Sequence, residues 1–383
     1  LISTGDLVMI IGLTFSMIES SWGLLNNLDD LVNEAGKIKE SFSMFQQDFS
    51  VVDIDNSNIL SVKNPKIEFQ NLKYSYQENL IFDNFNLKIE AGEKIGLVGV
   101  SGSGKSTLIR HINRLIDPTA GEVLVNNVDV CTLDEKEILE FRKKTMSMVF
   151  QRFGLFPHKT IIENVAYGLE IQEVPEDQRR EIAQGQISAV GLDGFEHQYP
   201  AQLSGGMQQR VGLARALATD PEILLMDEAF SALDPLIRSE MQNQLVDLQA
   251  KLKKTIVFIT HDLDESLKLG DHIGILNGGR LVQVGRPEDI ILNPADDYVK
   301  AFVKDVNRSK VLRAKTIMTK LDKFDKSSTK PSSTYKYDED TFIEDLVPKV
   351  LKDRSTIEVV DKKGTTKGYI TSDELSVALT KTH

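Results

Sequence analysis

Residues 99–107 read Gly-Val-Ser-Gly-Ser-Gly-Lys-Ser-Thr, which are the residue types and the spacing of a phosphate-binding loop. Glycines let the backbone wrap closely around an anion, and the N–H groups of the loop and of the following helix point at it. Lys105 supplies a point charge for β- and γ-phosphates, and the Ser106 hydroxyl can bind Mg²⁺. The pattern therefore predicts a nucleotide site with contacts from Gly99, Ser101, Gly102, Ser103, Gly104, Lys105, Ser106 and Thr107.

Four polar residues come directly after stretches that we expect to be strands, namely Gln151, Asp227, Glu228 and His261. Strands that alternate with helices predict a parallel sheet, whose ligands bind at the carboxyl ends of the strands. Asp227 can reach Mg²⁺ directly or through water, and Glu228 can orient or deprotonate an attacking water. His261 can hold that water or the γ-phosphate, and Gln151 can bind Mg²⁺ and sense the γ-phosphate. We predict Glu228 and His261 as catalytic residues, and Ser106, Gln151 and Asp227 as Mg²⁺ ligands.

A second anion site is predicted where residues 203–210 read Leu-Ser-Gly-Gly-Met-Gln-Gln-Arg. Ser204 can cap the helix that follows, and Gly205 and Gly206 leave its first amides uncovered. We also expect Gln208 to contribute to this site. Two phosphate-binding segments so far apart in one chain make sense if two copies face each other and each completes the site of the other.

The composition is that of a folded globular protein, with 41% apolar and 27% charged residues among 383. A net charge of −12 argues against a nucleic-acid partner, because phosphate backbones require a basic face. Cys131 is the only cysteine, so a disulfide framework is excluded. Tyr76, at the end of an alternating strand pattern, is either an adenine-stacking residue or part of the core.

The N-terminal segment has a different character. Residues 7–18 carry no charge and are fewer than the 20 or so that span a bilayer, so they form either a buried or interfacial helix or the inner end of a spanning helix. Apolar residues at alternating three- and four-residue spacing over 28–49 predict one long amphipathic helix, packed on a domain or in a coiled coil. A polar linker follows over 51–65.

These motifs, in this order and spacing, resemble the nucleotide-binding subunit of an ATP-binding cassette (ABC) transporter. The resemblance adds Asp234, in the run Ser-Ala-Leu-Asp at 231–234, to the nucleotide-binding residues. It implies an α/β P-loop NTPase fold with a RecA-like parallel-sheet core, an antiparallel β subdomain and a helical signature subdomain. It further implies ATP and Mg²⁺ as cofactors, a head-to-tail dimer with a second cassette, and membrane permease subunits as partners.

Parts of the chain resemble different branches of this family. Residues 109–306 are similar to the ATPase subunits of glycine betaine/proline importers, through runs such as Leu-Phe-Pro-His at 155–158 and His-Asp-Leu-Asp-Glu at 261–265. Residues 1–99 look like the end of an ABC exporter half-transporter. The tail resembles one motif of a CBS-type regulatory module, which normally pairs two. The predicted boundaries are 1–50 for the long helix, 66–310 for the cassette, 311–340 for a linker and 341–383 for the partial CBS-like module.

The sequence thus predicts an ATPase that drives uptake of glycine betaine, proline or a related quaternary amine. The resemblance implies a permease and, indirectly, a substrate-binding protein as partners. We expect it at the cytoplasmic face of the membrane, held peripherally or by an N-terminal membrane helix. The alternatives are the nucleotide-binding half of a fused exporter, and a non-transport ABC ATPase acting in translation or repair. The acidic charge disfavours the last of these.

Overall fold

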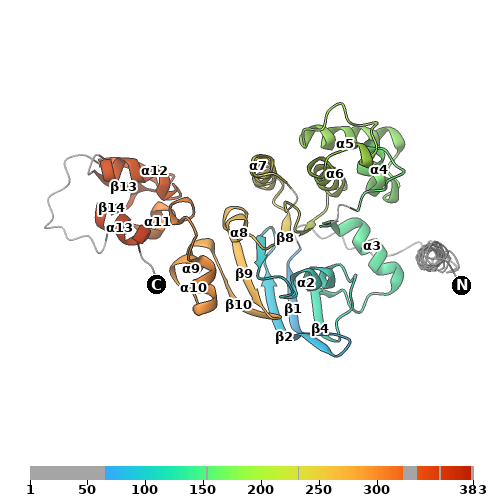
Figure 1. Cartoon of the computed structure of the whole chain (residues 1–383), viewed down its shortest axis with the longest axis horizontal. Helices are drawn as coiled ribbons and strands as arrows, with labels where there is room; N and C mark the ends of the chain where they lie inside the picture. The colour runs from blue at the N-terminus through green and yellow to red at the C-terminus, as the bar shows by residue number, and fades with distance from the viewer. Residues whose placement is uncertain (1–64, 152–153, 232, 322–333, 353–354, 381–383) are drawn as a thin grey trace, which may run out of the picture. The chain divides into compact units, whose positions relative to one another are not determined.

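The structure is a computed structural model that describes residues 65–383, except 152–153, 232, 322–333, 353–354 and 381–383 (Figure 1). The chain divides into two units, residues 1–59 and 60–383, and every described residue belongs to the second. The predicted long helix over 1–50 and all but the last residue of the linker over 51–65 lie outside the described residues. Within the described ranges, every helix is too short or too polar to cross a membrane.

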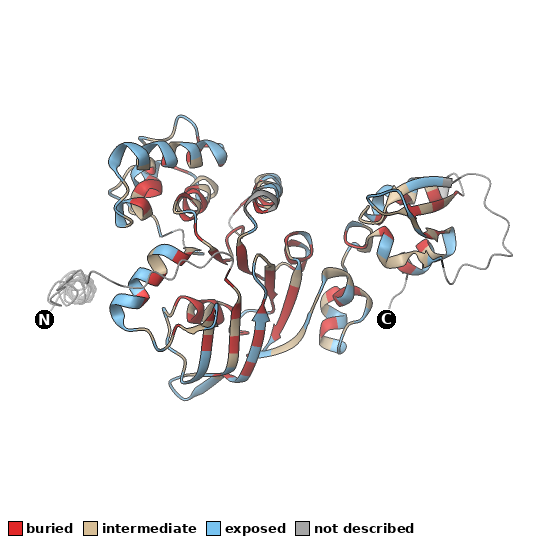
Figure 2. Cartoon of the chain, turned by 180° about the vertical axis from the view of Figure 1, so that it is seen from behind, coloured by how far each residue is buried: buried red, intermediate tan, exposed pale blue. Residues whose placement is uncertain are grey.

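A six-stranded sheet forms the centre of the fold, in the order β10-β9-β3-β8-β7-β6. Its strands are β3 (Lys94–Val98), β6 (Met146–Val149), β7 (Ile223–Asp227), β8 (Thr255–Thr260), β9 (His272–Asn277) and β10 (Arg280–Gly285). Only β10 runs antiparallel to its neighbour. β7 and β8 are buried at every position, as expected for strands covered on both faces (Figure 2). The parallel-sheet core is confirmed.

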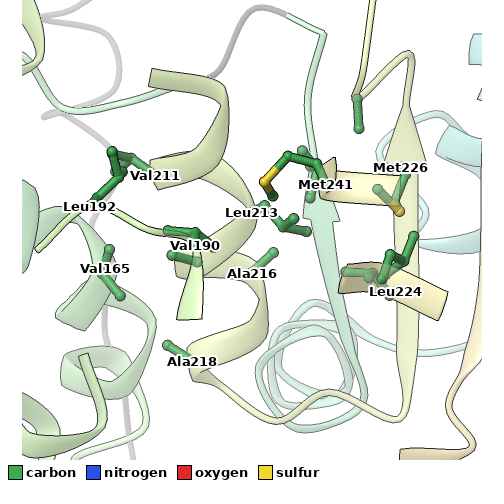
Figure 3. Close-up of a cluster of buried hydrophobic side chains, with 14 of the residues drawn as sticks. Val165, Val190, Leu192, Val211, Leu213, Ala216, Ala218, Leu224, Met226 and Met241 are labelled. Carbon is green, nitrogen blue, oxygen red and sulfur yellow. The ribbon is translucent and has the colours of Figure 1, made fainter. Parts of the chain in front are cut away.

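Successive residues of the central strands pack on opposite faces of this sheet, as the pleat requires. On one face, Leu224 and Met226 join the cluster of α6 (Gly205–Ala218) and α7 (Pro235–Leu252) (Figure 3). On the other face, Ile223 and Leu225 join the cluster that contains α2 (Lys105–Ile112). The strand ends are therefore held between two hydrophobic clusters, which position the polar residues that follow them.

A second, antiparallel sheet has the order β2-β1-β4-β5. Its strands are β1 (Ile67–Tyr76), β2 (Asn79–Ile89), β4 (Ala120–Val125) and β5 (Val128–Asp129). Phe69, Phe82 and Phe85 from this sheet pack into the same cluster as Leu108 of α2. The predicted antiparallel subdomain is therefore present, and it supports the helix that follows the phosphate-binding loop.

The helical subdomain contains α4 (Ile161–Ile171), α5 (Glu176–Ala189) and α6, which pack on one another. Thr160 and Glu163 form a capping box at the start of α4, which satisfies two N-terminal donors. Val165, Ile187 and Val211 are fully buried between the helices. The mostly helical region predicted for 161–218 is confirmed.

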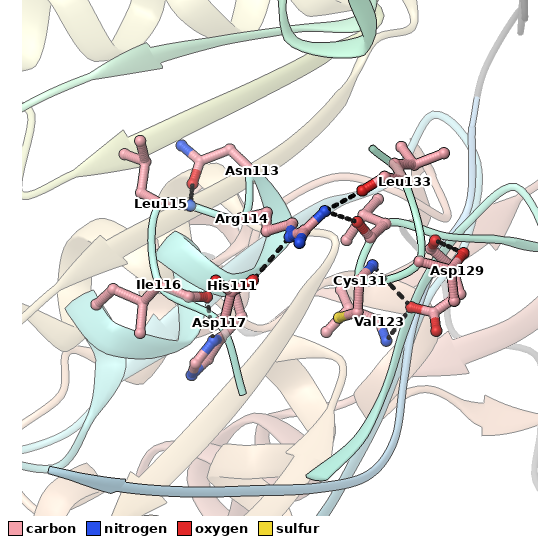
Figure 4. A network of polar contacts seen from close by, with 12 residues as sticks. His111, Asn113, Arg114, Leu115, Ile116, Asp117, Val123, Asp129, Cys131 and Leu133 are labelled. Atoms are coloured by element: carbon pink, nitrogen blue, oxygen red, sulfur yellow. Dashed lines mark hydrogen bonds and ion pairs between the residues drawn. The ribbon is translucent and has the colours of Figure 1, made fainter. Parts of the chain in front are cut away.

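Arg114 ties the end of α2 to neighbouring loops (Figure 4). Its guanidinium donates to Asp117 Oδ1 at 2.7 Å and to the backbone carbonyl of Leu133. Arg142, in α3 (Glu135–Thr145), donates to the carbonyls of Asn113 and Arg114, each at 2.7 Å. Arg142 thus caps carbonyls just beyond the end of α2, and Arg114 joins that end to the loop that carries Leu133. They fix the helix at the end opposite the phosphate-binding loop.

The remaining helices of the cassette are α8 (Leu263–Leu269), α9 (Pro287–Leu292) and α10 (Asp297–Val303), followed by a 3₁₀ turn over Arg308–Lys310. The tail has α11 (Ala314–Ile317), α12 (Ile343–Val347), a π-helical turn over Pro348–Lys352 and α13 (Ser372–Thr380). Its sheet has the order β11-β14-β13-β12, from β11 (Thr319–Lys320), β12 (Thr334–Asp338), β13 (Thr356–Val360) and β14 (Thr366–Ile370).

The tail begins earlier than the sequence predicted. Leu312 and Ala314 are buried in its core, and β12 pairs in parallel with β13. These residues fall in the predicted linker over 311–340, so the described parts of that segment belong to the folded tail. The sequence prediction placed this boundary too late because it did not recognise β12 as a strand. β12 is short and polar, and its pairing with β13 becomes apparent only in the folded chain.

Candidate nucleotide-binding site

The phosphate-binding loop joins the carboxyl end of β3 to α2. Gly102 and Gly104 have φ values of +80° and +93°, which glycine adopts without strain. A Cβ on Gly99 would lie 2.3 Å from the backbone oxygen of Leu276, so the loop packs directly against β9. No side chain caps the start of α2. The first amides of that helix are therefore left for an anion.

Lys105 is folded back over its own loop. Its ammonium donates to the carbonyls of Gly99 at 2.7 Å and Val100 at 3.1 Å, and to Ser103 Oγ at 3.2 Å. Burial lowers the pKa of Lys105, and the charges of Glu228 and Asp227 act in the opposite direction. The side chain is thus a partly desolvated cation at the position where the loop amides converge.

Ser106 and Asp227 form an oxygen-rich pair beside Lys105. Ser106 Oγ donates to Asp227 Oδ1 at 2.9 Å, and Arg110 lies 3.6 Å from Asp227 Oδ2. Asp227 is only 1% exposed, and burial raises the pKa of its carboxyl group. Mg²⁺ prefers oxygen ligands and usually keeps waters and substrate phosphates in its shell. The hydroxyl of Ser106 and the carboxylate of Asp227 are oxygen ligands of this kind, and they already lie within hydrogen-bonding distance of each other.

Three predicted residues meet at one carboxylate. Gln151 Nε2 donates to Glu228 Oε2 at 3.0 Å, and His261 Nδ1 lies 3.5 Å from the same oxygen. Glu228 has a φ of +49°, which is uncommon outside glycine, and its N–H donates to the carbonyl of Ile259 in β8. This backbone turn, together with the bond to β8, places the carboxylate beyond the strand ends. Because Gln151 donates through Nε2, its Oε1 is left for a metal ion.

The predicted signature residues lie on the helical subdomain. Ser204 Oγ accepts from the N–H of Met207 and so caps α6, as expected. Gln208 donates to the carbonyls of Pro200 and Leu203, at 3.0 and 3.2 Å, across the 3₁₀ turn Pro200–Gln202. Among the described residues, no hydrogen bond or ion pair joins 204–208 to the phosphate-binding loop of the same chain.

Two further predicted nucleotide contacts have different environments. Tyr76 is 61% exposed at the end of β1, so the structure excludes the alternative that it belongs to the core. Asp234 accepts from the N–H of Ile237 and caps α7. Tyr76 is thus free to stack on a planar group, whereas Asp234 already has a structural role.

Sequence reasoning missed the residues that hold these groups. Arg110 pairs with Asp227, and its place four residues after Ser106, on the same helix face, could have indicated this. Arg215 Nη1 donates to the carbonyl of Gly154 at 2.6 Å. The fully buried Asn164 bonds the backbone of Phe156, Lys159 and Thr160. Arg215 and Asn164 thus fix the loop that follows Gln151, and no local sequence pattern reveals either residue.

Glu265 is a buried carboxylate beneath the His261 segment. It is 6% exposed and accepts from Thr260 Oγ1 at 3.0 Å. Burial raises its pKa to about 7 from the ordinary 4.5, with a further increase from Asp262, while Thr260 and Arg238 act against the shift. The folded chain thus keeps this proton at a pH where the unfolded chain has lost it. The free energy of unfolding therefore falls as the pH rises from about 4.5 to about 7.

Glu265→Gln is expected to raise the free energy of unfolding at pH 8 by roughly 1–3 kcal/mol, because a neutral amide has no buried charge to desolvate. The gain should shrink as the pH falls and approach zero well below pH 4.5, where the glutamate is protonated in both states. Denaturation of both proteins at several pH values measures this difference. The exposed Glu181→Gln is the control, with no pH-dependent gain; an equal gain for Glu265→Gln at all pH values would contradict the assignment.

The comparisons with known proteins agree with this geometry. The family described as ABC transporter matches residues 82–231. The chain is 58% identical over 233 residues to the glycine betaine/carnitine transport ATP-binding protein GbuA of Listeria monocytogenes, covering 61% of this chain and 59% of that protein. It is 55% identical over 232 residues to ProV of Escherichia coli, a glycine betaine/proline betaine transport system ATP-binding protein, covering 61% and 58%. The chain thus spans less than two thirds of these curated relatives.

A third relative aligns over more of the chain. It is the trimethylamine N-oxide transport system ATP-binding protein TmoW of Pelagibacter ubique, 44% identical over 288 residues, covering 75% of this chain and 83% of that protein. Among solved structures, the dimeric bacterial ABC transporter cassette MJ0796 is 34% identical with a TM-score of 0.55, covering 58% of this chain and 98% of that one. By identity and coverage, the chain belongs to the ABC transporter family and contains its ATP-binding cassette.

Proposed function

We propose that the chain is the ATP-hydrolysing subunit of an importer for glycine betaine, proline betaine, proline or a related quaternary amine. The observation that carries the chemistry is the meeting of Gln151, Glu228 and His261 at one carboxylate oxygen, beyond the strand that ends at Asp227. The names of the relatives GbuA and ProV support the substrate class.

In this proposal the loop of residues 99–107 holds the phosphates of ATP through its amides and Lys105, and Tyr76 stacks on the adenine. Ser106, Asp227 and Gln151 would hold Mg²⁺, which would supply positive charge to neutralise the β- and γ-phosphates. Glu228 accepts a proton from the attacking water, while His261 keeps that water and the γ-phosphate in place. The hydrogen bond from Gln151 and the backbone bond to β8 hold Glu228 before the reaction, so little rearrangement is needed.

The site as proposed is completed by a second copy of the chain. Ser204, Gly205 and Gly206 present the capped start of α6 to solvent, and Gln208 holds the turn before them. Asp234 lies in the loop that we expect at the same interface. A head-to-tail dimer would place these amides on the γ-phosphate bound by the partner copy, and the MJ0796 cassette is described as a dimer. This arrangement explains why one chain carries two phosphate-binding segments.

We further propose permease subunits as partners at the cytoplasmic face of the membrane, with a substrate-binding protein acting through them. The loop of residues 154–160 is the proposed contact, since Arg215 and Asn164 hold its backbone in place. The protein would be held there peripherally or by a membrane helix in the exporter-like residues 1–99. The tail, which has the order β12-α12-β13-β14-α13, is proposed to be a single CBS-like unit that regulates turnover.

Uptake of labelled glycine betaine into vesicles that hold the chain and a permease of a glycine betaine importer tests the proposal. ATP-dependent accumulation is expected, and ATP-dependent export of the label would support the fused-exporter alternative instead.

The same vesicles with a chain ending at Lys310 test the regulatory role proposed for the tail. We expect retained ATP hydrolysis with a changed dependence on salt, and an identical salt dependence would exclude regulation by the tail.

A further inference from the structure

The position of His261 depends on the backbone that carries it. Its side chain is 60% exposed, and among the described residues the one polar contact of its imidazole is Glu228 Oε2, 3.5 Å from Nδ1. The residues around it are bonded to one another instead. The N–H of Asp262 donates to Thr260 Oγ1 at 3.0 Å, and the N–H of Glu265 donates to Asp262 Oδ1 at 3.3 Å. Asp262 thus caps α8 and closes the turn on which the histidine lies.

Arg238 connects this turn to another helix. It lies on α7, and its Nη1 is 3.7 Å from Asp262 Oδ2. Its Nη2 donates at 3.1 Å to the carbonyl of Leu233, the residue directly before Asp234, which caps α7. One guanidinium therefore joins the starts of α7 and α8. It also links the two predicted site residues at those starts, Asp234 and His261.

Stability alone does not account for an arginine at position 238. The Nε of Arg238 is buried and, among the described residues, has no hydrogen-bond partner. A buried donor without a partner destabilises the fold, and an apolar side chain would avoid that loss. The ion pair with Asp262 offsets little of it, because both side chains are about one third exposed to solvent. What the arginine supplies is a fixed connection between two segments of the site.

We propose that Arg238 is a positioning residue for His261, because it ties the turn that carries this histidine to the start of α7. In the proposed head-to-tail dimer, Asp234 at that start meets the partner copy. Closure of the dimer would therefore reach His261 through the guanidinium and align it with the attacking water. The inference rests on the proposed ATPase function for its effect on hydrolysis, but not for the link between the two segments.

Arg238→Met tests the proposal, since methionine keeps helix propensity and much of the side-chain length but makes neither polar contact. We expect faster hydrogen exchange of the amides of residues 262 and 265. The kcat for MgATP should be about 5–10-fold lower, as expected when one charge-assisted hydrogen bond no longer positions a catalytic group. The KM for MgATP should stay unchanged, because the loop of residues 99–107 is intact.

Two further variants and a control complete the test. Asp262→Ser keeps a cap on α8 but is too short to reach the guanidinium, so its kcat should also fall. The double variant should have a kcat no lower than that of Arg238→Met, because both changes remove the same link. Arg180→Met is the control, since Arg180 pairs with Glu176 on the exposed face of α5. It should match wild type in exchange and in kcat.

The outcomes separate the link from the proposed function. Unchanged exchange at residues 262 and 265 in Arg238→Met would overturn the link, and unchanged kcat would overturn the positioning role. Losses of kcat that multiply in the double variant would show that Arg238 and Asp262 act independently, against the proposal. A lower melting temperature together with a higher KM would show a general structural role instead. Wild-type protein that hydrolyses no ATP would remove the proposed function, whereas the exchange measurement still decides on the link.

Discussion

Glu228→Gln is expected to leave ATP binding intact and to slow hydrolysis about 10²–10⁴-fold, the usual contribution of a general base. Glutamine has the same size and can still accept the hydrogen bond from Gln151, so the local geometry should persist. What it lacks is a carboxylate that can take the proton from the attacking water. Because ATP would then persist at the interface, we expect the variant to accumulate as a nucleotide-bridged dimer.

Calorimetric titration with MgATP, phosphate release and size measurement with light scattering check these three expectations. Glu222→Gln is the matched control, because Glu222 immediately precedes the opposite end of β7 and lies away from the strand ends that carry the site. It should hydrolyse ATP at the wild-type rate. Wild-type turnover in Glu228→Gln would falsify the assignment of Glu228 as the base.

Phe82→Ala is expected to lower the free energy of unfolding by about 3–5 kcal/mol, the range for deleting a buried aromatic ring. Phe82 is fully buried, and its ring lies 5.3 Å from that of Phe85 and 6.1 Å from that of His111, between ring centres. A Cβ on Gly104 would come within 2.8 Å of it. The ring therefore fills the space directly beneath the phosphate-binding loop, and its loss should also weaken MgATP binding.

Chemical denaturation and nucleotide titration of the same preparations measure both effects. Phe82→Leu should recover most of the lost stability, because it refills much of the cavity. Leu80→Ala, at an exposed position of the same strand, should change neither quantity by much. A fall in stability without any effect on MgATP binding would show that the loop keeps its shape without this support.

Local patterns were enough to predict much of the cassette. Two strands, over 94–98 and 255–260, appear where the sequence indicated, because each is an uninterrupted apolar run. The helices before the signature also appear there, because residues such as Thr160 and Pro175 mark where they start. The phosphate-binding loop was likewise recognisable, since its glycines and Lys105 act within nine consecutive residues. The same holds for Ser204, which caps the helix next to it.

Contacts between distant segments were decided only by the tertiary structure. The sequence placed Gln151, Glu228 and His261 at strand ends, but their convergence on one oxygen depends on the pairing of β7 with β6 and β8 and on the positive φ of Glu228. No local sequence pattern indicates that Tyr76 is exposed or that the side chain of Asn164 makes all of its hydrogen bonds. Nor does one indicate the contacts of Arg238, because burial and hydrogen bonding depend on neighbours that the chain brings together only when it folds.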